Sequence, residues 1–208
     1  MRHFKKKESP EDFENWKAKK NSEWEPSWGN FQQPEKNIVL KSLLGEQGYL
    51  CCYCGQEVDE AHSHIEHLIP RGKDDSLALE YGNLLCSCQP DGFIPKQPVH
   101  CGHKKEDWYE PELFVSPLMN GCEERFSYTA LGEIYPTDAS DIAAKKTIEV
   151  LDLDVGFLNE TRKKLIEAFL DLSKEDLEKI ISSYSIPREN NRLYPYCFVV
   201  TNFFRSYV

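Results

Sequence analysis

The chain has 208 residues, a length that suits one ordinary domain or one domain with appendages. Its longest apolar runs, such as residues 198–200, are far too short to span a bilayer, which argues against a membrane protein. The formal net charge is −10, whereas a protein that binds nucleic acid unaided usually carries a basic surface. If the substrate is a nucleic acid, we therefore expect a partner to deliver or hold it.

The N-terminus has no pattern of a secretory signal, because the three lysines at 5–7 are not followed by an apolar segment. We therefore expect a cytoplasmic protein, whose thiols stay reduced and whose clustered cysteines favour metal binding. A disulfide framework is the alternative. It is the weaker one, because the cysteines are concentrated locally and mixed with histidines.

The first 35 residues are polar, with three tryptophans among prolines, and indicate an extended arm with one short helix near 11–20. The tryptophans predict that this arm packs on its own domain or, alternatively, on a partner. The next elements expected in chain order are a helix over 36–48, a short strand at 49–50 and a strand over 64–69. A loop over 71–76 should follow, and then a turn at 81–83 that opens a helix carrying Leu84 and Leu85. Residues 89–100 are rich in proline and predict a loop.

The pattern changes after Trp108 and becomes helical from about residue 138. We expect strands at 112–119 and 125–128 and a hairpin at 131–135. Helices should follow at 141–151, 154–172 and 177–184, and the last of them is preceded by a capping box at 173–176. The segment 194–207 should contain a final helix or strand. The predicted fold class is α+β. A small β-β-α metal core with a zinc knuckle, residues 36–118, lies between the arm, residues 1–35, and a mostly helical C-terminal region, residues 119–208, packed on the core.

Six of the eight cysteines and five of the six histidines lie between Cys51 and His103. Cys51 and Cys54 have the two-residue gap that lets one turn present two sulfurs to a zinc ion. Zinc held by four thiolates needs two more ligands, and the later candidates are Cys86, Cys88 and Cys101. The isolated Cys122 and Cys197 are interpreted as buried apolar residues.

An acid–histidine pair, Glu66-His67, and an asparagine, Asn83, lie between the two groups of cysteines. Hydrolysis of a phosphodiester needs a base to deprotonate water and a cation to stabilise the phosphate, and a neutral histidine is the natural base. One carboxylate and one amide oxygen suit the light coordination typical of Mg²⁺. The segment therefore predicts a structural zinc and a separate reaction site.

The motifs resemble those of the HNH endonuclease family. They are Cys51-x-x-Cys54, Ile65-Glu66-His67-x-x-Pro70, Asn83-Leu84-Leu85 and Cys101 followed by Lys105. The longer strings IEHLIPR, LEYGNLLCSC and CGHKK are most similar to the HNH component of Septu-type and retron-linked antiphage systems, over roughly residues 38–165. This resemblance implies a β-β-α metal fold in which the acid–histidine pair ends a strand and the asparagine starts a helix.

The resemblance also implies roles for single residues. His67 would be the general base, Glu66 a ligand of a catalytic Mg²⁺ or Mn²⁺, and Asn83 the second ligand or the residue that orients the base. Zinc would be held by Cys51, Cys54, Cys88 and Cys101, with Cys86 in reserve. Two departures are the twelve residues between Cys88 and Cys101 and the glycine that displaces the third catalytic histidine to His103.

Basic residues near the motif, Arg71, Lys104 and Lys105, could contact phosphate or be solvated surface charges. His62, His64 and His100 are interpreted as loop or strand residues, with a role as metal ligands as the weaker alternative. The expected function is a metal-dependent endonuclease that cleaves DNA by default, or RNA. The resemblance implies that it acts as the effector of an antiphage complex gated by a Septu-type ATPase, with a retron reverse transcriptase and its DNA or RNA product as further partners. The alternative is a zinc-knuckle adaptor without chemistry, which would not need Glu66, His67 and Asn83 together.

Overall fold

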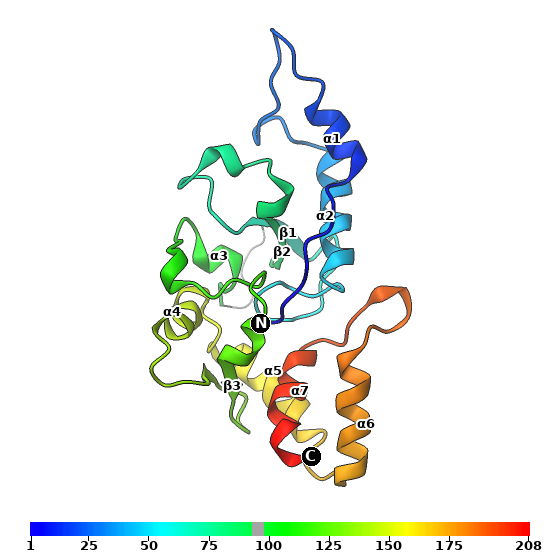
Figure 1. Cartoon of the computed structure of the whole chain (residues 1–208), viewed down its shortest axis with the longest axis vertical. Coiled ribbons are helices and arrows are strands. Elements are labelled where there is room, and N and C mark those ends of the chain that lie inside the picture. Colours follow the sequence, from blue (N-terminus) through cyan, green and yellow to red (C-terminus); the bar gives the residue numbers. More distant parts are fainter. Residues whose placement is uncertain (93–97) are drawn as a thin grey trace.

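A computed structural model describes residues 1–92 and 98–208 and shows a mixed α+β fold (Figure 1). The helices of this part of the chain are α1 Glu11–Lys17, α2 Glu35–Glu46, α3 Gly102–Lys105, α4 Ile142–Leu151, α5 Gly156–Glu167, α6 Lys174–Ser185 and α7 Cys197–Phe203. The arm with α1 and the helices α5 to α7 lie at opposite ends of the long axis, and the β1–β2 sheet with α3 lies between them.

Two small antiparallel sheets form the β part of the fold. Strand β1, Ser63–His67, pairs with β2, Leu84–Cys88, and this register sets Glu66 opposite Leu85. Every residue of β1 and β2 is buried, which is why neither strand shows a simple alternation of polar and apolar residues. Strand β3, Phe126–Tyr128, pairs with β4, Ile134–Pro136, as the predicted hairpin requires.

The buried amide of Gln47, just after α2, holds that helix to the β1–β2 sheet. Its Nε2 donates to the carbonyls of Leu50 and Cys86, and its Oε1 accepts from the Cys86 amide at 2.8 Å. The segment that leads into the cysteine knuckle is thereby tied to the middle of β2. Because buried polar groups need partners, this amide fixes both elements.

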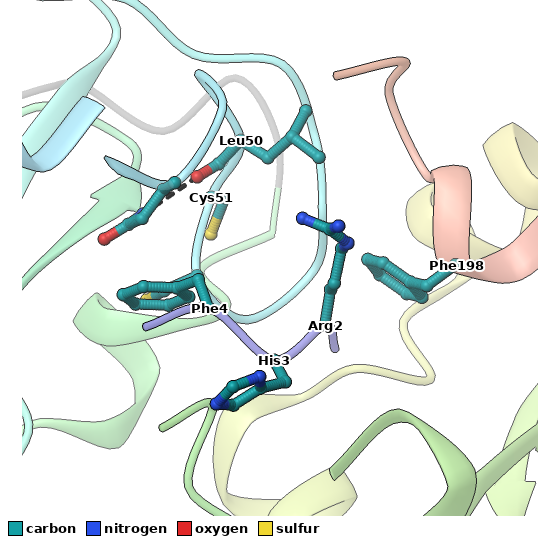
Figure 2. Close-up of a pocket in the computed structure, with 8 residues that line it drawn as sticks. Arg2, His3, Phe4, Leu50, Cys51 and Phe198 are labelled. Carbon is teal, nitrogen blue, oxygen red and sulfur yellow. Dashed lines mark hydrogen bonds between the residues drawn. The ribbon is translucent and has the colours of Figure 1, made fainter. Parts of the chain in front are cut away.

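The N-terminal residues are part of the core. Met1 and Phe4 are buried, and the Phe4 amide donates to the Pro117 carbonyl at 3.2 Å. Figure 2 shows Arg2 between the knuckle segment at Leu50–Cys51 and Phe198 of α7, and Phe4 on the side of Cys51 away from Phe198. These residues line a cavity of ≈ 10 Å³. A cavity of this size holds about one water molecule, so the N-terminus fills the junction between the knuckle and the C-terminal helices.

Side-chain caps and one glycine set the geometry of the C-terminal region. Asp141 caps α4 by accepting from the Ala144 amide, and Ser173 caps α6 by accepting from the Asp176 amide. Gly132, in the β3–β4 turn at φ +78°, packs directly on α5, where an added Cβ would lie 2.1 Å from the Asn159 carbonyl oxygen. The turn can approach α5 this closely only because residue 132 has no side chain.

Three local predictions were wrong. Leu84 and Leu85 begin strand β2 and not a helix. The prediction failed because a short apolar run that is buried on both faces has no periodicity that distinguishes a strand from a helix. The segment 112–119 forms no strand and begins with a 3₁₀ turn, Pro111–Leu113. The expected strand at 49–50 is reduced to one bridge between Leu50 and Glu57.

Other predicted elements are found close to their expected bounds, among them α1, α2, α4, α6 and the β3–β4 hairpin. Of the expected proline-rich loop over 89–100, residues 93–97 lie outside the described residues. Among the helices of the described ranges, none combines the length and the apolar character needed to cross a membrane.

Candidate metal centres and active-site cavity

Four thiols come together in the buried core, and they are the four predicted from the sequence. The sulfurs of Cys51, Cys54, Cys88 and Cys101 all lie within 4.8 Å of one another, and those of Cys54 and Cys88 are 3.9 Å apart. Tetrahedral zinc with Zn–S bonds of about 2.3 Å places its sulfurs about 3.8 Å apart. The donor set therefore fits a structural zinc ion.

The four thiols differ in their acidity: the pKa values of Cys51 and Cys54 lie below the usual range, and those of Cys88 and Cys101 lie above it. Burial raises the pKa of the Cys51 thiol, but hydrogen bonds from the neighbouring sulfurs, Cys101 first, outweigh it and hold the pKa well below its usual range. A thiolate is the form that binds metal. His100 contacts this cluster from outside, with its Nε2 3.5 Å from the Cys88 sulfur. Cys86 is not among the four, and its backbone is bound by Gln47.

A second group of polar residues lines a cavity of ≈ 240 Å³ between β1 and the segment around α3. Five residues singled out in the sequence reach it: Glu66, His67, Arg71, His103 and Lys105. The cavity also contains residues that were not expected to form a site: His64, Pro70, Asp91, Gly102, Glu106 and Asp107. Acidic, basic and imidazole groups are thus concentrated in one hollow.

Glu66 is held at the wall of this cavity by two donors to the same oxygen. The Tyr53 hydroxyl, which lies within the cysteine knuckle, donates to Oε1 at 3.0 Å, and the Lys105 ammonium lies 2.9 Å from it. The other oxygen, Oε2, is 3.6 Å from Nε2 of His64. Burial raises the pKa of Glu66, but the His64 hydrogen bond and the Lys105 charge lower it overall, so this carboxyl is ionised.

The backbone carbonyl of Gln89 orients two imidazole rings. It lies 2.7 Å from Nδ1 of His64 and 2.8 Å from Nε2 of His103, and the ring centroids are 4.1 Å apart. Since a carbonyl only accepts, His64 carries a proton on Nδ1, and its Nε2 faces Oε2 of Glu66. Burial lowers the pKa of His64, but Glu66 raises it overall, so Nε2 is a donor toward Glu66 in the protonated ring and offers a lone pair once the ring is neutral. This is the usual arrangement of a metal-binding histidine, whose second nitrogen donates to a backbone carbonyl.

The donor atoms of His64, Asp91 and His103 lie within 4.8 Å of one another and could hold a metal ion. Gly102 leaves the space for one beside Glu66. A Cβ at residue 102 would lie 2.6 Å from Oε2 of Glu66 and 2.8 Å from Nε2 of His64. The glycine that separates Cys101 from His103 therefore opens a space lined by a carboxylate oxygen and an imidazole nitrogen, which fits a divalent cation.

His67 ends β1 and lines the cavity beside Glu66. Its Nε2 donates to the Ala78 carbonyl at 3.0 Å, so the neutral ring has its lone pair on Nδ1. Burial lowers the pKa of His67 most strongly, and the charge of Arg71 lowers it further against the opposing effects of the Ala78 carbonyl and Glu66. The ring is therefore neutral near pH 7 and able to accept a proton.

Two of the basic residues differ in their surroundings. Arg71 is exposed at the mouth of the cavity. Lys105 is buried, with 1% of its surface exposed, and its ammonium donates to the His67 carbonyl at 3.0 Å in addition to pairing with Glu66. Lys105 was expected to be either a solvated surface charge or a contact to phosphate. It is neither, because its ammonium is buried and both of its partners lie at the end of β1.

Asn83 does not line the cavity and does not start a helix. It ends a 3₁₀ turn, Tyr81–Asn83, and its buried amide binds the loop that follows β1. Its Oδ1 accepts from the Ile69 amide at 2.8 Å, and its Nδ2 donates to the carbonyls of Ile69 and Leu77. Of its two predicted roles, this placement favours orienting the base, since the loop carries the carbonyl that holds His67.

Replacing Asn83 with alanine is expected to lower the free energy of unfolding by about 1–3 kcal/mol, because three partly buried backbone groups lose their partner. Hydrogen exchange measured by mass spectrometry should become faster over residues 69–78 and change little over the cysteine cluster. Asn83→Asp, which keeps the acceptor for the Ile69 amide, is the control and should lose less. Unchanged exchange over 69–78 in Asn83→Ala would contradict this role.

Sequence reasoning missed Tyr53 and Asp91 and gave His64 a ligand role only as the weaker alternative. A signal for His64 was present, because residues two apart on a strand share a face, and His64 therefore accompanies Glu66. Tyr53 carried none, since a tyrosine between knuckle cysteines is equally compatible with a surface residue. Asp91 lies in a loop whose path from β2 to α3 no periodicity predicts.

Two known proteins resemble this chain over most of its length. The candidate HNH endonuclease of retron Ec83 from Escherichia coli is 26% identical over 193 residues, which cover 72% of this chain and 74% of that protein. The Septu protein PtuB of Bacillus thuringiensis is 26% identical over 164 residues, which cover 74% of this chain and 55% of that protein.

The resemblance to the HNH proteins of retron and Septu systems is confirmed. No family model matches the chain. The retron relative, which is named an HNH endonuclease, supports a nuclease at the level of the family.

Proposed function

We propose that this chain is an HNH-type endonuclease that hydrolyses phosphodiester bonds of nucleic acid as part of an antiphage defence complex. The observation that carries the proposal is the convergence of Glu66, His64, His103 and His67 on one cavity between a two-stranded antiparallel sheet and a short following helix. A zinc-knuckle adaptor has no use for a buried carboxylate, a row of oriented imidazoles and a neutral histidine in the same hollow.

Glu66, His64 and His103 would hold the catalytic divalent cation, with Asp91 at the rim. When bound, such a cation supplies positive charge against the negative charge that develops on the phosphate. Mg²⁺ prefers oxygen ligands, whereas imidazoles favour transition metals, so of the two expected ions this donor set suits Mn²⁺ better. The carboxylate is kept ionised by Lys105, and the rings are kept in position by the Gln89 carbonyl.

His67 would take the proton from the attacking water through Nδ1. The Ala78 carbonyl fixes the tautomer, and burial keeps the ring neutral, which are the two conditions a histidine base needs. The Lys105 ammonium holds the His67 carbonyl and Glu66 together, so the base and the ligand keep a constant separation. Arg71, exposed at the mouth, is placed to contact a phosphate of the substrate.

His64→Ala is expected to weaken Mn²⁺ binding at least about tenfold, because losing a ligand or its supporting group typically costs that much. Titration of the zinc-loaded chain with Mn²⁺, followed by calorimetry or electron paramagnetic resonance, measures it. His62→Ala is the matched control, since that ring is exposed and pairs with Asp59 outside the cavity. Equal Mn²⁺ affinity in the His64 variant and the wild type would remove His64 from the proposed ligand set.

An ATPase of the Septu kind is proposed as the partner that delivers the substrate and gates cleavage, with a retron product as a further component. The acidic net charge supports this, because the isolated chain should hold nucleic acid weakly and in a salt-sensitive manner. The test incubates the chain, with and without the ATPase, with labelled DNA and RNA in Mg²⁺ or Mn²⁺. Cleavage only with the partner supports gating, and full cleavage by the isolated chain at physiological salt contradicts it.

A further inference from the structure

A residue of the N-terminal arm touches the proposed base. Trp28, in the segment between α1 and α2, lies with its ring centroid 4.4 Å from that of His67, at an interplanar angle of 70°. This is the edge-to-face geometry in which aromatic rings attract one another. The arm thus reaches the end of β1. The division of the sequence into an arm and a core predicted that only residues of the core would surround His67.

Trp28 is itself held in place from two directions. On the arm, Phe31 lies 5.4 Å from Trp28 and is almost completely buried, at 2% exposed. Phe31 packs in turn on Phe13 and Trp16 of α1, at 5.0 and 5.4 Å. This aromatic cluster anchors the indole, so the contact with His67 is made by a fixed group and not by a freely rotating one.

Two cations approach the same indole from other elements. The Arg71 guanidinium lies 5.3 Å from the ring centroid, and the Lys36 ammonium, from the first turn of α2, lies 5.7 Å from it. Both distances are within the range of cation–π attraction. Trp28 therefore joins the arm, α2 and the loop after β1 beside the cavity.

The indole supplies a restraint that the hydrogen bond of His67 cannot. A single bond from Nε2 to the Ala78 carbonyl fixes one edge of the imidazole but leaves the ring free to tilt about that bond. A second contact on the ring surface removes this freedom. A base must lie within hydrogen-bond reach of the water it deprotonates, so the tilt of the ring decides whether Nδ1 faces the substrate.

We propose that Trp28 is a positioning residue for His67, so that the N-terminal arm is part of the catalytic unit. This inference rests on the proposed role of His67 as the base. It concerns an aromatic residue outside the HNH motif, which acts through another residue and does not touch the reacting atoms.

The first measurement is steady-state cleavage by the full, zinc-loaded chain in the assembly that supports cleavage. Trp28→Ala should lower kcat about tenfold to a hundredfold with KM within about twofold, since a misplacement near 1 Å can cost that much. Trp28→Phe should recover part of the loss, because a phenyl ring keeps an edge-to-face contact. Trp24→Ala is the matched control: Trp24 is equally half-buried on the arm but packs on Trp16, at 5.6 Å.

The second measurement does not depend on cleavage. The indole beside His67 should shift the ring-proton signals of this histidine, and NMR of histidine-labelled protein should show them move in Trp28→Ala and stay in Trp24→Ala. The proposal is overturned if Trp24→Ala lowers kcat as much as Trp28→Ala, or if the His67 signals do not move. If the wild-type chain cleaves nothing, the proposed function fails, while the NMR comparison still decides whether the indole of Trp28 contacts His67, which is the premise of this inference.

Discussion

Replacing His67 with alanine is expected to reduce phosphodiester cleavage by about 100- to 10,000-fold, the usual contribution of a general base. The structure makes this residue the natural acceptor of the proton, because its ring is neutral, its tautomer is fixed by the Ala78 carbonyl and it lines the cavity beside Glu66. The measurement is single-turnover cleavage of a labelled duplex in Mn²⁺ under conditions where the wild type is active.

The variant should keep its fold and zinc, since the His67 side chain contacts none of the four thiols. Zinc content and thermal unfolding should therefore stay close to the wild-type values. His62→Ala, an exposed histidine five residues earlier, is the matched control and should cleave normally. If His67→Ala still cleaves, His67 is not the base. If the variant loses its zinc, the residue has a structural role instead.

Cys88→Ala should have the largest effect on stability. Removing one thiolate leaves three buried sulfurs without a complete ligand set, so we expect the zinc to be lost and the free energy of unfolding to fall by about 3–5 kcal/mol. For a chain of this size the corresponding drop in Tm is about 10 °C or more. Metal analysis after gel filtration, combined with thermal unfolding, measures both.

Cys86→Ala makes the same chemical change two residues away on the same strand. Cys86 is buried but does not belong to the thiol cluster, so this variant should keep one zinc per chain and lose about 1 kcal/mol. If Cys86→Ala loses its zinc while Cys88→Ala keeps it, Cys86 and not Cys88 is the third ligand.

The parts of the site that the sequence predicted are those in which spacing determines geometry. The gap between Cys51 and Cys54 defines a knuckle, and the family resemblance implied Cys88 as the third ligand, with Cys86 in reserve. Both lead to the cluster observed. The acid–histidine pair lies in the cavity for the same reason, since adjacent residues at the end of one strand cannot separate far.

Other features depended on contacts between distant segments, which spacing does not encode. Leu84 and Leu85 are compatible with a helix until the pairing with β1 is known. The burial of Lys105 could not be predicted, because a lysine is buried only where a carboxylate pairs with it, and the pairing with Glu66 is a contact between distant segments. Trp28 was expected to pack on something, but its partner His67 could be identified only when the arm was placed on the core.

Two residues that hold side chains of the cavity in place are direct neighbours of proposed zinc ligands. Tyr53, between Cys52 and Cys54, holds Glu66, and Gln89, immediately after Cys88, holds both His64 and His103. We therefore expect zinc binding by the four thiols to be coupled to the shape of the cavity, because the backbone that carries Cys54 and Cys88 also carries Tyr53 and Gln89. A chain stripped of metal by a chelator is therefore expected to lose the alignment of Glu66, His64 and His103 even though every one of these residues is still present.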